Sequence, residues 1–360
     1  MTAPLNIYAG PGALATLKEN GFYPLLFNYF LGASGGPKWF VLAGLDRVLF
    51  PEWFDTRGGQ VQVIGSSAGA FRAACAVQND PLAAINRLAE HYSTTVYSKK
   101  PTANEITTKA RELLHHVIGK AGAYEIISNE RFKAHIFAVR CHKAMASRGR
   151  YTQLNGLLMS AAANAVRRKN LNMFYTRHVF SAPGSELTIH DPYQLNTERS
   201  ELQFVNVKDA LLASGSIPLV LEGVEKIVGV PEGVYRDGGI VDYHFDLSFG
   251  PRKGLVLYPH FFDTPVPGWF DKNLKRRLPH RSSYDNVVML VPSADFVQSL
   301  PYGKIPDRKD FNTMDAKTRI RYWQTVLSET DRLGEYFMKV TEDGSVMDVI
   351  KPLPFACLDG

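Results

Sequence analysis

A serine between glycines lies where an apolar run meets an alanine-rich stretch. The segment Gly65-Ser66-Ser67-Ala68-Gly69 follows Val61–Ile64, which is typical of a buried strand, and precedes the helical pattern of Ala70–Val77. In a sharp strand-to-helix turn built by Gly65, Ala68 and Gly69, the Ser67 hydroxyl would project into a site, and the helix N-terminus would stabilise developing negative charge. The pattern therefore predicts that Ser67 is a nucleophile.

A second glycine-rich segment lies upstream, between the strand-like run Leu25–Leu31 and the helical pattern Trp39–Leu49. Its sequence is Ser34-Gly35-Gly36-Pro37-Lys38. A phosphate loop is excluded, because proline separates the lysine from the last glycine and tryptophan follows where such a loop needs Ser or Thr. A plain tight turn is one remaining interpretation. We favour the other, an oxyanion hole in which backbone N–H groups and the charge of Lys38 meet a developing negative charge.

An aspartate followed by two glycines forms the third constellation, Tyr235-Arg236-Asp237-Gly238-Gly239. It comes after the segment Ala213-Ser214-Gly215-Ser216-Ile217-Pro218. By itself, an Asp before two glycines is often no more than a β-turn. The order along the chain favours a functional role for Asp237, because a glycine loop and a flanked serine precede it.

In this order the four segments resemble the signature of the patatin-like phospholipases, over about residues 25–260. The resemblance implies that Ser67 is the nucleophile and Asp237 the base of a dyad without histidine. It also implies that the N–H groups of Gly35 and Gly36, in the loop that continues through Pro37 and Lys38, bind the oxyanion. The chain departs from the family pattern at Ser34, the place of the first loop glycine, and at Trp39, where glycine is common.

Acyl transfer by such a dyad is chemically coherent. A carboxylate within hydrogen-bond reach of a serine hydroxyl can take its proton if burial raises the carboxyl pKa. The acyl-serine would then be cleaved by water that Asp237 activates. We therefore expect a serine acyl hydrolase that cleaves acyl esters of phospholipids or related lipids, without a cofactor.

Two alternatives to this function stay open. The departures at Ser34 and Trp39 motivate a lipid-binding or regulatory protein that keeps the fold without catalysis. An α/β-hydrolase esterase with a Ser-His-Asp triad is less favoured, although His244, His260 and His280 follow Asp237 in the required order.

Short β-like runs alternate with longer helical patterns along the chain. This alternation predicts an α/β fold with a mainly parallel sheet covered on both faces, and the resemblance implies a three-layer α/β/α core. We expect an N-terminal segment (1–24), a catalytic domain (25–260) and a C-terminal extension packed on the core (261–360). Prolines interrupt that extension before a final helix expected over Thr318–Val340.

No pattern in the sequence indicates a metal or a cofactor. C-x-x-C and H-E-x-x-H motifs are absent from the sequence, and His115-His116 would point to different faces of a helix. Gly10–Ala15 imitates a dinucleotide fingerprint, but no acid lies between Glu19 and Asp46 where one is expected, so a turn into a short helix is favoured.

Charge and cysteine use bear on partners and location. Cysteine occurs 3 times without close pairing, and the N-terminus lacks a signal-peptide pattern, so we expect a cytoplasmic protein in a reducing compartment. The net charge of +6 accompanies no nucleic-acid motif. The basic, amphipathic run Trp269–Leu278 could give peripheral contact with an anionic membrane surface, but packing on the core is favoured. The oligomeric state is left open.

Overall fold

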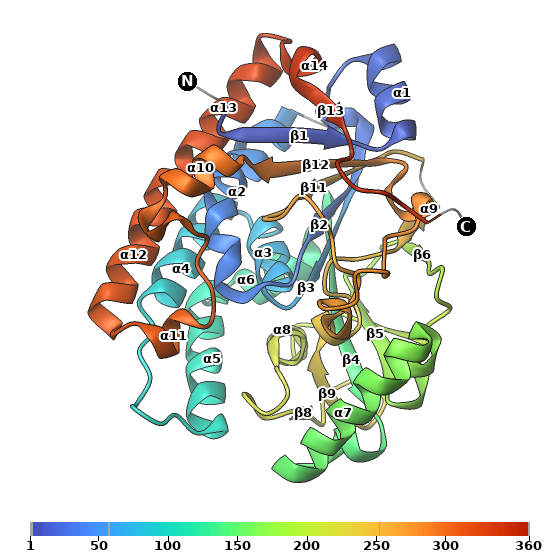
Figure 1. Ribbon diagram of the computed structural model, residues 1–360, viewed down its shortest axis with the longest axis vertical. Coiled ribbons are helices and arrows are strands. Elements are labelled where there is room, and N and C mark those ends of the chain that lie inside the picture. Colours follow the sequence, from blue (N-terminus) through green and yellow to red (C-terminus); the bar gives the residue numbers. More distant parts are fainter. Residues whose placement is uncertain (1–2, 57, 252, 359–360) are drawn as a thin grey trace.

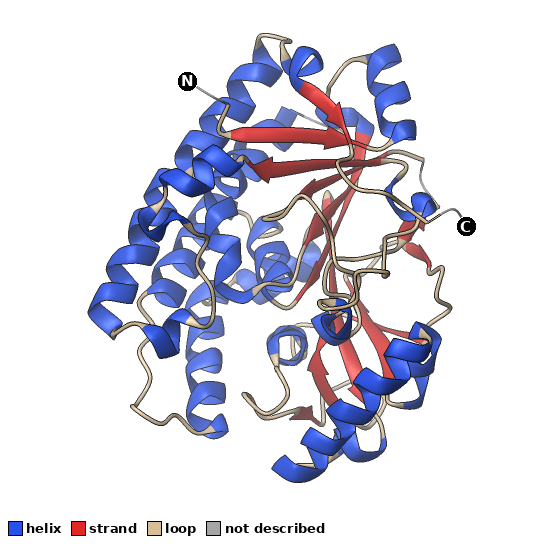
Figure 2. Ribbon diagram, viewed as in Figure 1, coloured by secondary structure: helices blue, strands red, loops and turns tan. Residues whose placement is uncertain are grey.

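The chain is built around one large, mostly parallel β-sheet with helices on both faces (Figures 1 and 2). The computed structural model describes residues 3–56, 58–251 and 253–358. The sheet has 11 strands, with β13-β1-β12-β11-β2-β3-β4-β5-β7 in spatial order and β8 and β9 attached beside β4. Their bounds are β1 Leu5–Ala9, β2 Phe27–Gly32, β3 Val61–Ser66, β4 Phe132–Cys141, β5 Tyr175–Ser181, β7 Thr197–Glu201, β8 Val224–Glu225, β9 Val234–Asp237, β11 Leu255–Pro259, β12 Val287–Pro292 and β13 Ile350–Pro352.

The centre of the sheet is a run of parallel strands, β12-β11-β2-β3-β4. Every residue of β3 and β12 is buried, as expected for parallel strands that are covered on both faces. Gly32 at the end of β2 pairs in register with Gly65 near the end of β3, so the segments that follow these strands leave from the same edge. The predicted α/β class, with a mainly parallel sheet between helices, is confirmed.

Helices flank this sheet on both sides. Figure 1 shows α2, α4, α12 and α13 packed together on its left and α7 on its lower right. The helices are α1 Pro11–Asn20, α2 Ala43–Val48, α3 Ala68–Ala76, α4 Pro81–Ser93, α5 Ala103–Ile118, α6 Gly122–Ser128, α7 Arg150–Val166, α8 Val207–Gly215, α9 Arg281–Tyr284, α10 Ala294–Ser299, α11 Asp310–Thr313, α12 Ala316–Glu329, α13 Asp331–Glu342 and α14 Val346–Val349. A small separate sheet pairs β6 (Thr188–His190) with β10 (Ser248–Gly250).

Two helices differ from the sequence prediction. The single helix expected over Thr318–Val340 is wrong, because α12 and α13 separate at the buried Thr330, whose hydroxyl accepts the N–H of Gly44 at 3.0 Å. The pattern from Trp39 begins inside a 3₁₀ helix, Gly36–Leu42, which leads into α2. Gly10–Ala15 is a strand-to-helix turn between β1 and α1, as predicted.

Both ends of the chain contribute strands to the central sheet. β1 lies antiparallel to β12 and parallel to β13, so residues from the segments 1–24 and 261–360 pair with each other at one edge. β12 also joins β11, which belongs to the segment 25–260. None of the helices in the described residues combines the length and hydropathy that crossing a bilayer requires.

Candidate active site

Ser67 occupies a tight turn between β3 and α3. Its backbone has φ 53° and ψ −123°, a region that residues other than glycine rarely adopt. The flanking glycines let α3 lie close to the sheet: a Cβ on Gly69 would lie 1.7 Å from the carbonyl oxygen of Gly32, and one on Gly65 would lie 2.2 Å from that of Gly69. The turn therefore requires glycine at both positions, and it holds Ser67 at the N-terminus of α3, followed by Ala68.

The Ser67 hydroxyl meets Asp237, which lies at the end of β9. Ser67 Oγ donates a hydrogen bond of 2.8 Å to Oδ2 of Asp237, and Oδ1 of the same carboxylate accepts the N–H of Gly239 at 2.7 Å. Pairing of β9 with β4 puts Asp237 opposite Ala138 in the sheet register. Ser67 is 8% exposed and Asp237 6% exposed, so the pair is buried but faces a pocket.

Burial changes the acidity of Asp237. Desolvation raises the pKa of its carboxyl group to about 6, while the hydrogen bonds from Ser67 and Gly239 and the charges of Arg308 and Lys272 oppose that rise. At neutral pH the group is still ionised. It is also a stronger proton acceptor than an ordinary aspartate, which is what general-base chemistry on a serine requires.

The segment Ala213–Pro218 fixes both members of the pair. Ser214 Oγ accepts the backbone N–H of Ser67 at 2.9 Å and donates to the carbonyl oxygen of Phe137 at 2.6 Å. The carbonyl oxygen of Ser216 accepts the N–H of Asp237 at 3.0 Å. The sequence analysis singled out this segment only because it lies between the Ser67 and Asp237 motifs. That it holds the backbone of both residues is seen only in the structure.

The glycine loop lies beside this pair. Gly35 and Gly36 line the same pocket as Ser67, and in the described residues their N–H groups have no hydrogen-bond partner. Gly36 has φ +56°, which directs the chain into the 3₁₀ helix that begins there with Pro37 at its first turn. Ser34 donates to the carbonyl oxygen of Ser66 at 3.1 Å and thereby ties the loop to β3.

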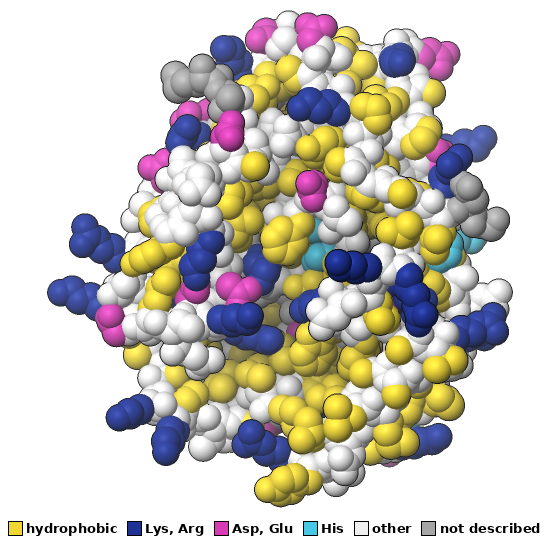
Figure 3. Space-filling model, viewed as in Figure 1, with side chains coloured by type: hydrophobic (Ala, Val, Ile, Leu, Met, Phe, Trp, Pro, Cys, Tyr) yellow, Lys and Arg dark blue, Asp and Glu magenta, His cyan; other side chains and the backbone are white. Residues whose placement is uncertain are grey.

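The pocket has a volume of about 570 Å³ and two kinds of lining. On the side of α3, α4 and α5 its lining is mainly apolar apart from Lys109, with Trp39, Phe71, Leu88, Ile106, Leu113 and Leu221 among its walls. Lys38, Lys272 and Arg308 also line it. Figure 3 shows a hollow with hydrophobic side chains in the lower half of this face and Lys and Arg side chains around its upper rim. The pocket is thus amphipathic.

The cationic side chains are unequally neutralised. Lys38 forms an ion pair with Asp307. In the part of the chain that the structure describes, neither Lys272 nor Arg308 has an ion pair with a carboxylate; the Lys272 ammonium instead lies 4.0 Å from the centre of the Tyr243 ring. Desolvation, with the nearby charges of Lys38 and Arg308, lowers the pKa of Lys272 to about 8. This group of cations can accept an anion.

Lys272 belongs to the run Trp269–Leu278, in which the sequence suggested either a membrane contact or packing on the core. Trp269 and Phe270 pack against the buried cluster around Tyr175, and the run begins with a 3₁₀ turn, Trp269–Asp271. The presence of Lys272 and Arg308 in the pocket was missed by sequence reasoning, because both residues follow the segments that carry motifs and no local pattern connects them to Ser67.

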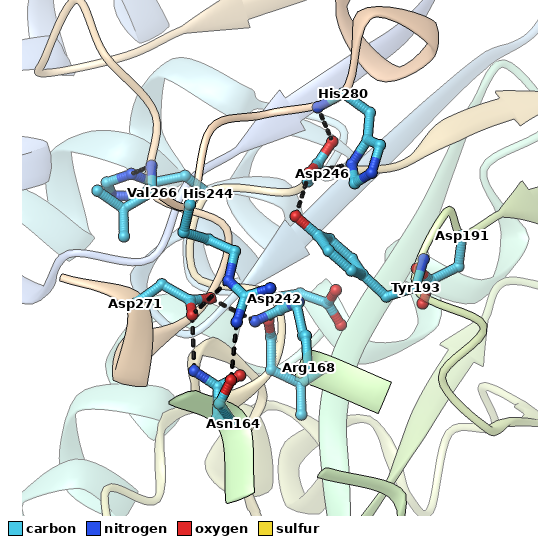
Figure 4. A network of polar contacts seen from close by, with 12 residues as sticks. Asn164, Arg168, Asp191, Tyr193, Asp242, His244, Asp246, Val266, Asp271 and His280 are labelled. Atoms are coloured by element: carbon cyan, nitrogen blue, oxygen red, sulfur yellow. Dashed lines mark hydrogen bonds and ion pairs between the residues drawn. The ribbon is translucent and has the colours of Figure 1, made fainter. Parts of the chain in front are cut away.

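A buried polar network holds the neighbour of Lys272 in place (Figure 4). Asp271 accepts hydrogen bonds from Asn164 Nδ2 at 2.7 Å, Arg168 Nη1 at 2.6 Å and Arg277 Nε at 3.2 Å. Asn164 belongs to α7, so the network ties the segment after Gly268 to that helix. Lys272 therefore extends into the pocket from an anchored backbone.

The histidines of the triad alternative have other partners (Figure 4). His244 Nδ1 accepts the N–H of Val266 at 2.8 Å, and His280 contacts the Asp246 carboxylate at 2.9 Å. His260 contacts the backbone of Phe262. Among the described residues, none of these three histidines forms a hydrogen bond with Ser67 or Asp237, so the geometry gives the triad no support.

The pair Ser67 and Asp237 is not accompanied by a cluster suited to a metal. Within the described ranges, no group of three or more His, Cys, Asp or Glu side chains is arranged to hold a metal ion.

Comparisons of the chain with protein-family models, with curated proteins and with solved structures found no match.

Proposed function

We propose that this protein is a patatin-like serine acyl hydrolase that cleaves acyl esters of phospholipids or related lipids. The observation that carries the proposal is the 2.8 Å hydrogen bond from Ser67 Oγ, on a strained strand-to-helix turn, to the buried carboxylate of Asp237. A serine paired in this way with a base of raised pKa has the two properties that an acyl-transfer nucleophile needs, exposure to a pocket and a proton acceptor within reach.

In the acylation step, Ser67 Oγ attacks the ester carbonyl carbon while its proton moves to Asp237. The negative charge that develops on the carbonyl oxygen is met by the N–H groups of Gly35 and Gly36 and by the N-terminus of α3. The tetrahedral intermediate then expels the alcohol, which takes the proton from Asp237. This step leaves an acyl-serine and an ionised Asp237.

In the second step, water replaces the alcohol. Asp237 accepts a proton from the water as its oxygen attacks the acyl carbon, and the same backbone donors meet the second oxyanion. When this intermediate collapses, the fatty acid leaves and the proton returns from Asp237 to Ser67 Oγ. One water is consumed and one ester bond is cleaved per cycle.

The amphipathic pocket supports the choice of an amphiphilic substrate. An acyl chain fits the apolar wall near Phe71 and Leu113, because burial of its methylene groups is favourable there. Lys272 and Arg308 suit a negatively charged group on the alcohol side of the ester, such as a phosphodiester. We therefore propose anionic acyl esters as preferred substrates.

A fluorophosphonate probe tests the dyad directly. We expect wild-type protein to be labelled at Ser67, and Ser67→Ala and Asp237→Asn to lose ester turnover by at least about a thousandfold while remaining folded. Ser93→Ala is the matched control, because Ser93 is also buried, lies outside the pocket lining and donates its hydroxyl hydrogen bond to Glu90 of its own helix, α4. Folded wild-type protein that binds lipid but takes no label would favour the non-catalytic lipid-binding alternative.

A further inference from the structure

Helix α7 buries several polar residues and exposes most of its large apolar residues. Gln153, Gly156, Ser160 and Asn164 are the buried positions of this helix. The opposite face exposes large apolar side chains, with Tyr151 83%, Leu158 62% and Val166 83% exposed. Leu154 and Met159 complete this outward face. An ordinary surface helix has the reverse arrangement, with its apolar stripe against the core.

The inward polar residues are held by specific partners, so the orientation of α7 is well determined. Gln153 Nε2 donates to the carbonyl oxygen of Ser147 at 2.8 Å. Ser160 Oγ shares a hydrogen bond of 3.0 Å with Tyr175 OH, and Asn164 donates to Asp271. Rotating the helix to bury its apolar face would break these buried contacts, which is costly. The outward apolar face is therefore a stable property of the fold.

The surroundings of this face are basic. The sequence contains no Asp or Glu between Glu130 and Glu186, a stretch that includes all of α7. Arg150 at the start of the helix and Arg167 and Lys169 just after its end are exposed. Glu225 pairs with Arg148 just before the helix, but α7 itself carries no acid. An apolar helix face with exposed cations at its ends and no acid on the helix matches the interface of a bilayer that contains anionic lipid.

The inward side of α7 contacts a segment of the pocket wall. Gln153 accepts the N–H of Leu219 at 3.3 Å, and the neighbours Pro218 and Val220 line the pocket. Figure 1 shows α7 on the lower right, where Figure 3 shows many hydrophobic side chains on the surface. The helix that presents the outward face is thus joined through its inward side to the segment that borders the pocket.

We propose that the outward face of α7, formed by Tyr151, Leu154, Leu158, Met159 and Val166, is a docking surface for membranes rich in anionic lipid. A second copy of the chain is the less suitable occupant, because a symmetric contact would bring the same cations toward each other. The proposal does not depend on catalysis.

Vesicle flotation tests this surface, in a Ser67→Ala background so that lipid turnover cannot alter the vesicles. We expect binding to vesicles of phosphatidylglycerol and phosphatidylcholine, weaker binding to pure phosphatidylcholine, and a decrease with added salt. Leu158→Glu should weaken binding by at least about tenfold, because it removes apolar contact and adds a negative charge. Tyr124→Glu on α6, where Tyr124 is 64% exposed, is the matched control and should bind as its parent does.

Two further measurements separate the electrostatic from the apolar contribution to membrane binding and control for folding. Arg150→Gln with Arg167→Gln leaves the apolar residues intact and should reduce binding to the anionic vesicles while leaving binding to phosphatidylcholine unchanged. Thermal melting shows that each variant is folded. The proposal is overturned if the parent protein does not float with anionic vesicles, or if Leu158→Glu floats equally well. A dimer that Leu158→Glu dissociates, without vesicle binding, would assign the face to a second copy instead.

Discussion

The hydroxyl of Ser67 donates a 2.8 Å hydrogen bond to the carboxylate of Asp237, a residue 170 positions later in the chain. The contact joins the turn after β3 to the end of β9, and β4 lies between these two strands in the sheet. Ser214 and Ser216 hold the backbone N–H groups of the two residues from a third segment. The bond is thus supported by fixed backbone on both sides, which favours a preorganised reaction geometry.

Ester turnover should depend on pH through two groups of the pocket. The pKa of Asp237 is raised to about 6, and the group accepts a proton only when it is ionised, so kcat/KM should fall below that pH. The pKa of Lys272 is lowered to about 8, and loss of its charge above that pH should reduce kcat/KM for anionic esters. A pH profile for an anionic and a neutral ester measures both limbs. The alkaline limb should disappear in Lys272→Gln, and a profile without an acidic limb would contradict Asp237 as base.

The cations of the pocket should determine a preference for anionic substrates. Lys272→Gln and Arg308→Gln should each lower kcat/KM for phosphatidylglycerol by about tenfold and leave a neutral ester nearly unchanged, because only the charged group loses its partner. Lys275→Gln is the control, since Lys275 lies in the same segment outside the pocket lining. Equal losses for both substrates would show that these residues do not select charge.

Backbone strain at Ser67 should appear as a difference between two inactive variants. Ser67→Ala keeps a side chain at φ 53°, whereas Ser67→Gly relieves the strain. We expect the glycine variant to have a free energy of unfolding about 1 kcal/mol higher than that of the alanine variant. Relief of such strain stabilises the folded state by roughly 1–3 kcal/mol, but the greater conformational entropy of glycine in the unfolded chain offsets part of this gain. Urea denaturation of both variants measures the difference. A less stable glycine variant would argue against strain at this turn.

The buried carboxylate of Asp271 should be important for stability. Asp271→Ala would leave the guanidinium of Arg168, which is 2% exposed, without its carboxylate partner. We expect a loss of about 3 kcal/mol in the free energy of unfolding, as is typical when one member of a buried ion pair is removed. Denaturant titration checks this, with the exposed Asp263→Ala as control. Retained stability would mean that the network in Figure 4 does not anchor this segment.

Local sequence was informative wherever a short segment carries its own physical constraint. Glycines on both sides of Ser67 allow a close strand-to-helix turn that a Cβ would block. The runs predicted as strands, Leu25–Leu31 and Val61–Ile64, correspond to the parallel strands Phe27–Gly32 and Val61–Ser66, although Leu25 and Leu26 belong to a 3₁₀ turn instead. The α/β class could be predicted from the alternation of strand and helix patterns along the chain. Each of these patterns depends only on residues that are close together in the sequence.

Contacts between distant segments were decided by the tertiary structure. The position of Lys272 and Arg308 in the pocket and the separation of α12 from α13 at Thr330 leave no periodic signal in their own segments. For α7, which side of the helix faces the core depends on partners such as Asp271, more than a hundred positions away from Asn164. The sequence by itself thus determined the chain's local turns, its strands and its candidate nucleophile. Only folding, by bringing together charges and polar groups from separate segments, decided what surrounds that nucleophile and which helix face remains open.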